Sequence, residues 1–566
     1  MLVCGIKASH DGGVAVIDGN RLLFSIEMEK LDNGLRYSTL GDLQRVGELL
    51  AAEGLDLTDI DQFVVDGWWT GGTENESSVL TSDGGVPFTL PVAPYLDGPT
   101  VRDPLHRHSF SAYDFGAPGT GYASYHHASN HLIGSYCSSP FAARGEDALV
   151  LVWDGGMTPR LYHVDAGARS VRPVSALLPL SGNAFADFCS HLEPFQVDTG
   201  DVGREERIRR HLSIAGKAMA YAALGTVHEA AFGVFDSILA DFPAVSIDNA
   251  HGLGEKVVAN REEVLPGLSN ADLIASFQDY LGRRLLHALT TVVRRRFPGS
   301  RLNLALGGGC ALNIKWNSAL RSTNLFRDVW IPPFPNDAGA AIGTAACEMF
   351  ARGGDLALDW DVYSGPRLGS AVPAGWAVER CDERRVAEIL HTEGEPIVVL
   401  SGRAELGPRA LGNRSILAPA ADPAMKARLN LVKDRAEYRP VAPICLTSRA
   451  AEVFDPGTPD RFMLFEHTLR PGWAERIPAI VHLDGTARLQ TIDPGMKSPT
   501  GAILAEYERL SGIPVLCNTS ANLNGHGFFP DVASAASWGL TRHVWADGLL
   551  YTNPDPTLNG TVEAGR

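Results

Sequence analysis

Two histidines spaced for a helix give the sharpest chemical signal in the sequence. His127 and His131 lie in residues 125–131 (YHHASNH). On a helix, residues four apart project from the same face, so both imidazoles could bind one metal ion. The alternative is a pair of ordinary helical histidines that bind nothing.

Two aspartates could complete a ligand set. Asp154 follows the apolar run 148–153, so its carboxylate should project from the carboxyl edge of a sheet, where the sites of α/β proteins lie. Asp337 precedes a helix rich in small residues and could instead be the N-cap of that helix. Two imidazoles and two carboxylates suit iron, manganese or zinc, with positions open to substrate oxygens. The sequence does not choose among these metals.

A glycine-rich turn is a candidate nucleotide site. Residues 306–313 (LGGGCALN) join a strand expected at 302–306 to a helix, and such turns bring backbone N–H groups close to phosphates. Lys217, within residues 214–219 (IAGKAM), could be a charge partner for the same ligand or an ordinary surface lysine. The candidate nucleotide-binding residues are Gly307, Gly308, Gly309, Asn313 and Lys217.

Basic residues gather in two stretches of the second half, 401–415 (SGRAELGPRALGNRS) and 430–440 (NLVKDRAEYRP). The planar fork of arginine suits phosphate and carboxylate recognition, so these stretches favour a polyanionic small ligand. The alternative is a solvated, salt-bridged face, although the glycine and proline content is unlike that of a surface helix. The cationic residues are Arg403, Arg409, Arg414, Lys433, Arg435 and Arg439. Arg488 follows downstream, and Asn518 and Ser520 come after a strand expected at 513–516.

Composition excludes several classes of protein. The 566 residues, 45% hydrophobic and 20% charged, are typical of a globular chain of several domains. A net charge of −17 argues against a nucleic-acid binder. No apolar run approaches the roughly 18 residues that span a bilayer, and the N-terminus does not resemble a signal peptide. The eight cysteines form no C-x-x-C pair, so we expect reduced thiols in a cytoplasmic protein.

The elements that must position these residues alternate between strands and helices, so we expect an α/β fold. Residues 66–124 are rich in glycine, proline and aromatic residues without a clear period, which is typical of a binding loop or a disordered insertion. The aromatic residues favour the binding loop. The stretch 353–376 indicates a boundary between domains at 1–355 and 365–566. Strands are expected at 14–17, 22–26, 61–65, 148–153 and 397–400, and helices at 40–53, 128–136, 271–297 and 383–393.

Together these residues resemble the antibiotic O-carbamoyltransferases, which include the tobramycin, cephalosporin, novobiocin and geldanamycin carbamoylating enzymes. The resemblance covers essentially the whole chain. Its most specific part is the string GPRALGNRS at 407–415, followed by NTS at 518–520. The other matching positions are 10–11, 127, 131, 154–155, 307–313, 332–337, 432–435, 439–440 and 488.

The resemblance implies an N-terminal actin-like ATPase domain of the Kae type and a C-terminal YrdC-like α/β domain. The YrdC-like domain would make carbamoyladenylate from carbamoyl phosphate and ATP with Mg²⁺. The N-terminal domain would hold a divalent metal, Fe²⁺ in the best-known relative, and would transfer the carbamoyl group to a hydroxyl. The partners are then small molecules, with no nucleic acid and no membrane.

The resemblance also implies roles for single residues. His10, beside Asp11, is a candidate base for the acceptor hydroxyl, because the pKa of an imidazole lies near working pH; it could instead be a structural turn residue. Arg409 and Lys433 are the candidate catalytic cations. Arg414, Arg435 and Arg439 join them on phosphates, Arg403 and Arg488 complete the binding set, and Asn518 and Ser520 are assigned to the carbamoyl end. His127, His131, Asp154 and Asp337 are the metal ligands.

Two other functions share these domain types. A tRNA threonylcarbamoylation-type enzyme is disfavoured by the acidic charge, and another actin-fold ATPase or kinase would leave the arginines of the second half without a role. For the acceptor, the aromatic, weakly acidic segment 67–124 favours a partly apolar molecule, a polyketide macrocycle or its sugar, over an aminoglycoside or a cephem.

Overall fold

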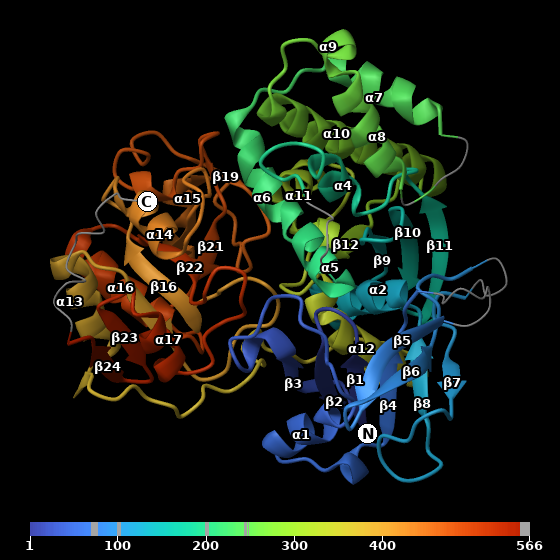
Figure 1. The fold of residues 1–566 in the computed structure, drawn as a ribbon, viewed down its shortest axis with the longest axis horizontal. Coiled ribbons are helices and arrows are strands. Elements are labelled where there is room, and N and C mark those ends of the chain that lie inside the picture. The colour runs from blue at the N-terminus through green and yellow to red at the C-terminus, as the bar shows by residue number, and fades with distance from the viewer. Residues whose placement is uncertain (70–76, 99–102, 198–202, 243–245, 247, 555–566) are drawn as a thin grey trace. The chain divides into compact units, whose positions relative to one another are not determined.

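Two mixed α/β units make up the computed structural model, which describes residues 1–69, 77–98, 103–197, 203–242, 246 and 248–554. The first unit comprises Met1–Leu23 and Thr39–Trp360, and the second comprises Phe24–Ser38 and Asp361–Arg566 (Figure 1). The domain bounds expected from the sequence, 1–355 and 365–566, stay a prediction. The structure also places the segment Phe24–Ser38 in the second unit, which no sequence pattern indicates.

The first unit contains a sheet with the strand order β3-β2-β1-β4-β8-β7. Strand β1 pairs antiparallel with β2 and parallel with β4, and β4 pairs parallel with β8. The central strands are buried on both faces, as their continuous apolar sequences require. The strands are β1 (Leu2–Lys7), β2 (Gly13–Asp18), β3 (Arg21–Glu27), β4 (Gln62–Asp66), β7 (His108–Phe110) and β8 (Tyr122–Tyr125).

A second sheet of the first unit has the order β11-β10-β9-β12-β13. Its strand β9 pairs antiparallel with β10 and parallel with β12, and β12 pairs parallel with β13. Five strands of the first sheet, in the order β3-β2-β1-β4-β8, match the order β11-β10-β9-β12-β13 strand by strand. One sheet topology therefore occurs twice in the first unit. The strands are β9 (Ala148–Val152), β10 (Arg160–Asp165), β11 (Ser170–Ala176), β12 (Asn303–Gly307) and β13 (Val329–Trp330).

Two buried helices, α2 (His127–Cys137) and α12 (Ala340–Arg352), pack closely against each other. Their backbones approach so closely that a Cβ at Gly343 would lie 2.2 Å from the carbonyl oxygen of Asn130. A Cβ at Gly307, at the end of β12, would lie 2.6 Å from the carbonyl oxygen of His131. Glycine at these two positions therefore lets the helix that carries both candidate metal histidines lie against β12 and α12.

Helices also form a separate layer of the first unit, drawn in green in Figure 1. The long α10 (Asn270–Arg296) begins with a capping box formed by Ser269 and Asp272 and ends in three arginines, which complement the helix dipole. The others are α4 (Ala184–Cys189), α5 (Arg204–Leu212), α6 (Ile214–Tyr221), α7 (Ala230–Ala240), α8 (Asn249–Ala259), α9 (Arg261–Val264) and α11 (Ile314–Arg321). Helices α1 (Arg45–Ala52) and α3 (Pro140–Ala143) are also in this unit.

The second unit is built on an eight-stranded sheet of order β14-β24-β23-β15-β16-β22-β17-β21. Side chains of β15 alternate between its two faces: Ile397 and Val399 pack in one core, and Val398 and Leu400 in the other. The strands are β14 (Ala377–Arg380), β15 (Ile397–Leu400), β16 (Arg414–Pro419), β17 (Ala442–Leu446), β21 (Gln490–Ile492), β22 (Val515–Ser520), β23 (His543–Ala546) and β24 (Leu549–Thr552).

Helices cover both faces of this sheet. Helices α13 (Glu383–Glu393) and α16 (Pro499–Ser511) contribute to the core that contains Ile397, whereas α14 (Met425–Val432) and α17 (Val532–Trp538) contribute to the other. A small sheet of β18 (Phe454–Asp455), β19 (His467–Leu469) and β20 (Thr486–Ala487) and the short helix α15 (Ala450–Val453) complete the unit.

Residues 66–124 differ from the expected loop. They form a hairpin, β5 (Ser77–Asp83) and β6 (Val86–Val92), and supply β7 and β8 to the first sheet. Our interpretation was therefore wrong for these parts, because a glycine turn at Gly84 and Gly85 and edge-strand pairing organise sequence that has no clear period. Residues 70–76 and 99–102 lie outside the described residues.

Other expected elements agree to within a few residues. The strand expected at 513–516 is instead β22 and continues to Ser520, so Asn518 and Ser520 lie within the sheet and not after it. The first helix begins at Arg45 and not near residue 40. No described helix has the length and apolar character needed to cross a membrane.

Candidate functional site

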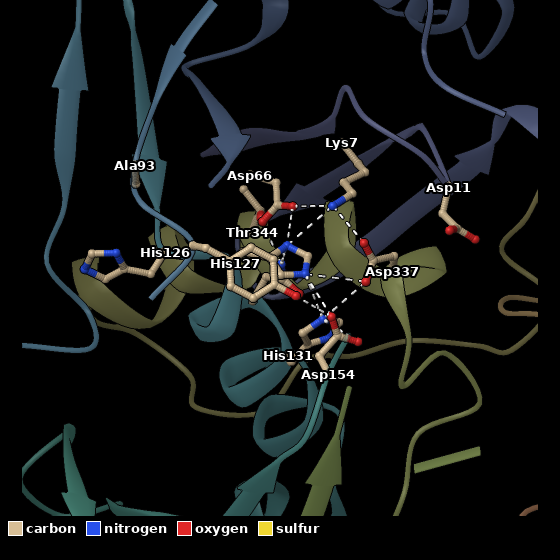
Figure 2. Close-up of polar contacts among 12 residues, drawn as sticks. Lys7, Asp11, Asp66, Ala93, His126, His127, His131, Asp154, Asp337 and Thr344 are labelled. Carbon is tan, nitrogen blue, oxygen red and sulfur yellow. Dashed lines mark hydrogen bonds and ion pairs between the residues drawn. The ribbon is translucent and has the colours of Figure 1, made fainter. Parts of the chain in front are cut away.

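Four buried side chains of the first unit converge at one point, as Figure 2 shows. They are His127 and His131 on α2, Asp154 just beyond β9, and Asp337 immediately before α12. One ligand atom from each lies within 4.8 Å of the others. The structure thus brings together the four predicted metal ligands from three distant parts of the chain.

The distances within this quartet fit a single metal ion. The two Nε2 atoms are 3.2 Å apart. Oδ1 of Asp337 lies 3.4 Å from Nε2 of His131, and Oδ2 of Asp154 lies 3.5 Å from Nε2 of His127. Donors at about 2.0–2.2 Å from one ion are about 2.8–3.6 Å apart at octahedral or tetrahedral angles. Facing imidazole nitrogens at this separation cannot both carry a proton, which leaves a lone pair for a cation.

A second carboxylate orients the first histidine. The Nδ1–H of His127 donates to Oδ2 of Asp66 at 2.7 Å, which leaves Nε2 as the ligand atom. Asn130 donates to the other oxygen of Asp66 at 2.6 Å. Burial raises the pKa of Asp66, but His127 and Lys7 outweigh it and lower that pKa to about 2. Asp66 therefore stays ionised and holds the imidazole in one tautomer.

Lys7, at the end of β1, links the carboxylates. Its ammonium lies 2.8 Å from Oδ2 of Asp66 and 2.9 Å from Oδ2 of Asp337. The ammonium contacts two of the three buried carboxylates of the site, those of Asp66 and Asp337 but not that of Asp154, and a divalent cation would balance the remaining charge. Burial opposes protonation of His127, but Asp66 and Asp337 raise the pKa of this imidazole well above its usual value, so proton and metal compete for the site.

The glycine turn holds Asp154 in place. The N–H of Gly309 donates to Oδ1 of Asp154 at 2.7 Å, and the hydroxyl of Tyr95 donates to Oδ2 at 2.6 Å. Gly308 has φ +89°, and a Cβ there would lie 2.4 Å from the carbonyl oxygen of Trp153. Asn313 caps α11 by accepting from the N–H groups of residues 315 and 316. The predicted contact of this turn with a nucleotide stays a prediction.

His10 lies beside the quartet. Its Nδ1 is 2.9 Å from Oδ2 of Asp11 and 3.7 Å from Oδ2 of Asp337, and its ring meets the edge of Trp68. Asp11 has φ +54°, a conformation that aspartate tolerates better than most residues. The predicted base is therefore within reach of the metal ligands. Lys217 lies on α6, 3.2 Å from Oγ of Ser213, and its predicted nucleotide contact is untested.

Aromatic rings line the same site. Trp69 stacks on Tyr95 with ring centroids 4.3 Å apart, and Tyr95 in turn packs on His127 at 4.5 Å. Trp68 meets His127 edge-on and lies 4.4 Å from the ammonium of Lys7. Trp69 is 36% exposed, so an aromatic surface lies next to the candidate metal ligands.

A cluster of arginines occupies the second unit. Burial lowers the pKa values of Arg409, Arg435, Arg439 and Arg488, and neighbouring guanidinium groups lower them further: that of Arg409 falls to about 10 and that of Arg435 to about 9. All stay charged at neutral pH. The Nε atoms of Arg409, Arg435 and Arg488 are buried without a hydrogen-bond acceptor among the described residues. Mutually repelling guanidinium groups with spare donors fit a polyanionic ligand.

Two of the predicted cations make many protein contacts. The ammonium of Lys433 donates to the carbonyl of Ser520 at 2.7 Å and also to Asn522, and burial lowers the pKa of Lys433 well below its usual value. Arg414 is 1% exposed and donates to the carbonyls of Ser401 and Asn413 at 2.7 and 2.8 Å. Arg414 thus holds its loop together, and its predicted contact with phosphate stays a prediction.

The remaining predicted residues lie around this cluster. Asn518 donates to Oε1 of Gln490 at 2.7 Å, and its own Oδ1 is buried without a donor among the described residues. The hydroxyl of Ser520 donates to Asn522 at 2.6 Å. The backbone carbonyl of Arg403 accepts from Asn413 at 2.9 Å. Asn518 therefore offers an acceptor to an amino group, as a carbamoyl-binding residue must.

Sequence reasoning missed four important residues: Lys7, Asp66 and Tyr95 in the first unit and Arg36 in the second. Asp66 could have been found, because it follows the apolar run 63–65 as Asp154 follows 148–153. Lys7 also ends an apolar strand, but a lysine there is usually exposed. Tyr95 is one of the aromatic residues of segment 66–124 that favour binding, although nothing singles it out among them, and no local signal marks Arg36.

Comparison with known proteins identifies the family of the chain. Residues 2–99 and 120–347 match the family model of the carbamoyltransferase N-terminus, and residues 387–546 match that of the carbamoyltransferase C-terminus. The chain therefore belongs to the carbamoyltransferase family, and the resemblance seen in the sequence is confirmed. It is an enzyme that transfers carbamoyl groups.

Relatives match along almost the whole chain. Nodulation protein U of Sinorhizobium fredii (strain NBRC 101917 / NGR234) is 45% identical over 580 residues, 98% of this chain and 100% of the relative. A 3'-hydroxymethylcephem-O-carbamoyltransferase of Streptomyces clavuligerus is 32% identical over 559 residues, 96% of this chain and 97% of the relative.

The geometry of the quartet leads to a prediction about metal content. We expect His127→Ala to lose bound metal, because one of four ligands is removed. Asp66→Asn should weaken metal affinity about 10–100-fold, because it holds the imidazole ring of His127 less firmly in its orientation. Elemental analysis after dialysis against graded chelator would measure both. The exposed Asp355→Asn should retain the wild-type metal content. Stoichiometric metal in His127→Ala would contradict the ligand set.

The arginine cluster leads to a prediction about stability. A lowered arginine pKa means that the charged form is less favourable in the folded than in the unfolded chain, so repulsion destabilises the protein at neutral pH. Arg409→Met should therefore keep or raise the free energy of unfolding, by up to about 2 kcal/mol, while stabilisation by added pyrophosphate is lost. Urea unfolding with and without pyrophosphate measures this. Arg509→Met, on the exposed face of α16, should leave both values unchanged, and a clear loss of stability in ligand-free Arg409→Met would refute the argument.

Proposed function

We propose that the protein is an ATP-dependent O-carbamoyltransferase. It makes carbamoyladenylate from carbamoyl phosphate and ATP and transfers the carbamoyl group to a hydroxyl of a secondary metabolite. The observation that carries this proposal is the presence of two chemically opposite sites in one carbamoyltransferase chain: an acidic metal-type quartet and a basic anion-type cluster.

The arginine cluster is assigned the activation step. Water releases phosphate from carbamoyl phosphate, and the carbamate oxygen attacks the α-phosphorus of ATP as pyrophosphate leaves, so one phosphate and one pyrophosphate form per turnover. Arg409, Arg435, Arg439 and Arg488 hold phosphate oxygens, with Mg²⁺ accompanying ATP. The buried Oδ1 of Asn518 accepts from the carbamoyl amino group. Preorganised donors of this kind are worth about 3–4 kcal/mol each.

The acidic quartet is assigned the transfer step. A divalent metal, Fe²⁺ in this proposal, suits the two imidazoles and two carboxylates and supplies Lewis-acid polarisation of the carbamoyl carbonyl. His10 accepts the proton of the acceptor hydroxyl, with Asp11 2.9 Å from its Nδ1 to orient the ring. The hydroxyl oxygen forms a bond to the carbamoyl carbon, and AMP leaves.

The finer fold assignment is part of the same proposal. The topology that occurs twice in the first unit supports an actin-like ATPase fold of the Kae type, since such a fold consists of two similar halves. The second unit, whose mixed sheet carries the arginine cluster, is assigned the YrdC-like fold. A tRNA threonylcarbamoylation-type enzyme would share these domains, but the net charge of −17 disfavours it.

The acceptor proposed is a polyketide macrocycle or its sugar. Trp69, which is exposed and stacks on the buried Tyr95, presents an aromatic surface next to the quartet. Such a surface suits a flat, partly apolar molecule with one hydroxyl directed at the carbamoyl group. One acid of the segment, Asp97, is already paired with Arg160 at 2.9 Å, so it does not contribute to a lining for a polycation. A cephem is the competing acceptor, since one relative is a 3'-hydroxymethylcephem-O-carbamoyltransferase.

Transfer can be tested directly with purified protein, Fe²⁺, carbamoyl phosphate, ATP and a panel of a macrolide, an ansamycin, a cephem and an aminoglycoside. We expect mass spectrometry to show one hydroxyl hydrogen replaced by a carbamoyl group in a macrolide or ansamycin. Modification of the aminoglycoside alone would refute the acceptor class but retain the reaction. The aminoglycoside is a polycation, so unlike the other three compounds it would require an acceptor site lined by acidic side chains.

The two half-reactions should separate by mutation. Arg435→Ala should lower pyrophosphate release from ATP and carbamoyl phosphate by about 30–1000-fold, the equivalent of about 2–4 kcal/mol for a lost phosphate donor. It should still transfer from supplied carbamoyladenylate. His127→Ala should still release pyrophosphate from ATP and carbamoyl phosphate but should not transfer the carbamoyl group from supplied carbamoyladenylate. Normal pyrophosphate release by Arg435→Ala would show that the cluster is not the activation site.

A further inference from the structure

The segment Phe24–Ser38 brings a cation of the N-terminal region into the second unit. We propose that Arg36 is a further phosphate-binding residue of the arginine cluster, supplied by this segment. The inference rests on the proposed function for the identity of the substrates. Its core, that Arg36 binds phosphate groups together with Arg409, can be tested without turnover.

Lys30 anchors the segment to the loop that carries Arg409. The buried ammonium of Lys30 donates to the carbonyls of Glu405 and Gly407, each at 2.7 Å, and to Oε1 of Glu27 at 2.6 Å. The same Oε1 accepts from the N–H of Gly407 at 2.9 Å. Because the buried ammonium of Lys30 needs all three acceptors, it holds the start of the segment Phe24–Ser38 against the loop that carries Arg409.

The loop that carries Arg409 is itself built around one carboxylate. Oε1 of Glu405 accepts from the N–H groups of Leu411, Asn413 and Arg414 at 2.7, 2.8 and 3.1 Å. Glu405 is fully buried, so the loop has little freedom to move away from the segment. The position of Arg409 and the position of the segment are therefore set by the same group of contacts.

A second set of contacts holds the end of the segment. The N–H of Arg36 donates to the carbonyl of Gly525 at 2.9 Å, and the N–H of Gly527 donates to the carbonyl of Gly34 at 2.9 Å. On the other side, the N–H of Tyr37 donates to Oε2 of Glu29 at 2.9 Å. The backbone of Arg36 is thus fixed from both sides, which limits the entropy lost when its side chain binds a ligand.

Charge shows where the side chain acts. After burial, Arg36 is the largest cause of the lowered pKa of Arg409, and it also lowers those of Lys433 and Arg439. Nε of Arg36 also lies 3.8 Å from Oε1 of Glu29, on the same segment. A guanidinium held this close to three like charges is stabilised when a polyanion binds among them.

Arg36 and Arg488 interact with the same two arginines. Arg36 lowers the pKa values of Arg409 and Arg439, and Arg409 and Arg439 lower that of Arg488. Arg36 thus adds a cation to the cluster, and a ligand with more than one phosphate group offers these cations more acceptors than a single phosphate does.

The binding test uses pyrophosphate as the probe and the full chain. Isothermal titration calorimetry should show at least a tenfold weaker affinity for Arg36→Ala, partial recovery in Arg36→Lys, and no change in the exposed control Arg509→Ala. Thermal midpoints of the ligand-free variants equal to or above that of the wild type would exclude misfolding as the reason. An affinity of Arg36→Ala within twofold of the wild type would overturn the proposal, as would equal weakening by the control.

Turnover separates this proposal from the proposed function. In wild-type enzyme that releases pyrophosphate, Arg36→Ala should raise KM for ATP or carbamoyl phosphate at least tenfold and leave KM for the acceptor unchanged. A change confined to the acceptor would count against Arg36 as a phosphate ligand. If the wild type binds pyrophosphate through Arg36 but forms no carbamoyladenylate, the proposed function fails and the binding role of Arg36 stands.

Discussion

Repulsion between like charges that are held close together is the constraint on which both sites depend. Carboxylates meet in the first unit, and guanidinium groups meet in the second. Neither the group of carboxylates nor the group of guanidinium groups is favourable by itself. The backbone that carries each group must therefore be fixed by other contacts. On the proposed function, ligands of opposite charge would recover the electrostatic energy, and both sites would therefore select highly charged groups.

The acidic site is fixed mainly by close backbone packing. Glycines at 307 and 343 let α2 lie directly against β12 and α12, and the turn after β12 returns an N–H to Asp154. Asp337 immediately precedes α12, so the same packing sets its distance from α2. The histidines do not need flexible side chains to meet the carboxylates. Their positions follow from where the helices and strands touch, which suits a metal site that must select by geometry.

The sequence predicts those parts of the sites whose signal is local. His127 and His131 are marked by helical spacing, Asp154 by its place after an apolar strand, and Arg409 by a specific glycine-rich string. Contacts made over long sequence separations are not marked. Lys7 meets residues near 66 and 337, and the segment of Arg36 meets residues near 405 and 525, and only the folded chain brings these together.

The same distinction explains the differences in secondary structure. Strands β9 and β15 are apolar runs of ordinary length, and their bounds agree with expectation. Strand β22 continues through three polar residues to Ser520, because its neighbours β16 and β17 provide partners on both sides. This continuation places Asn518 inside the sheet, where its side chain is fixed by Gln490.

On the proposed reaction, ATP and carbamoyl phosphate together carry far more negative charge than carbamoyladenylate. The arginines therefore hold the reactants more tightly than the intermediate, so the electrostatics that assemble the first reaction also favour release of its product for the second.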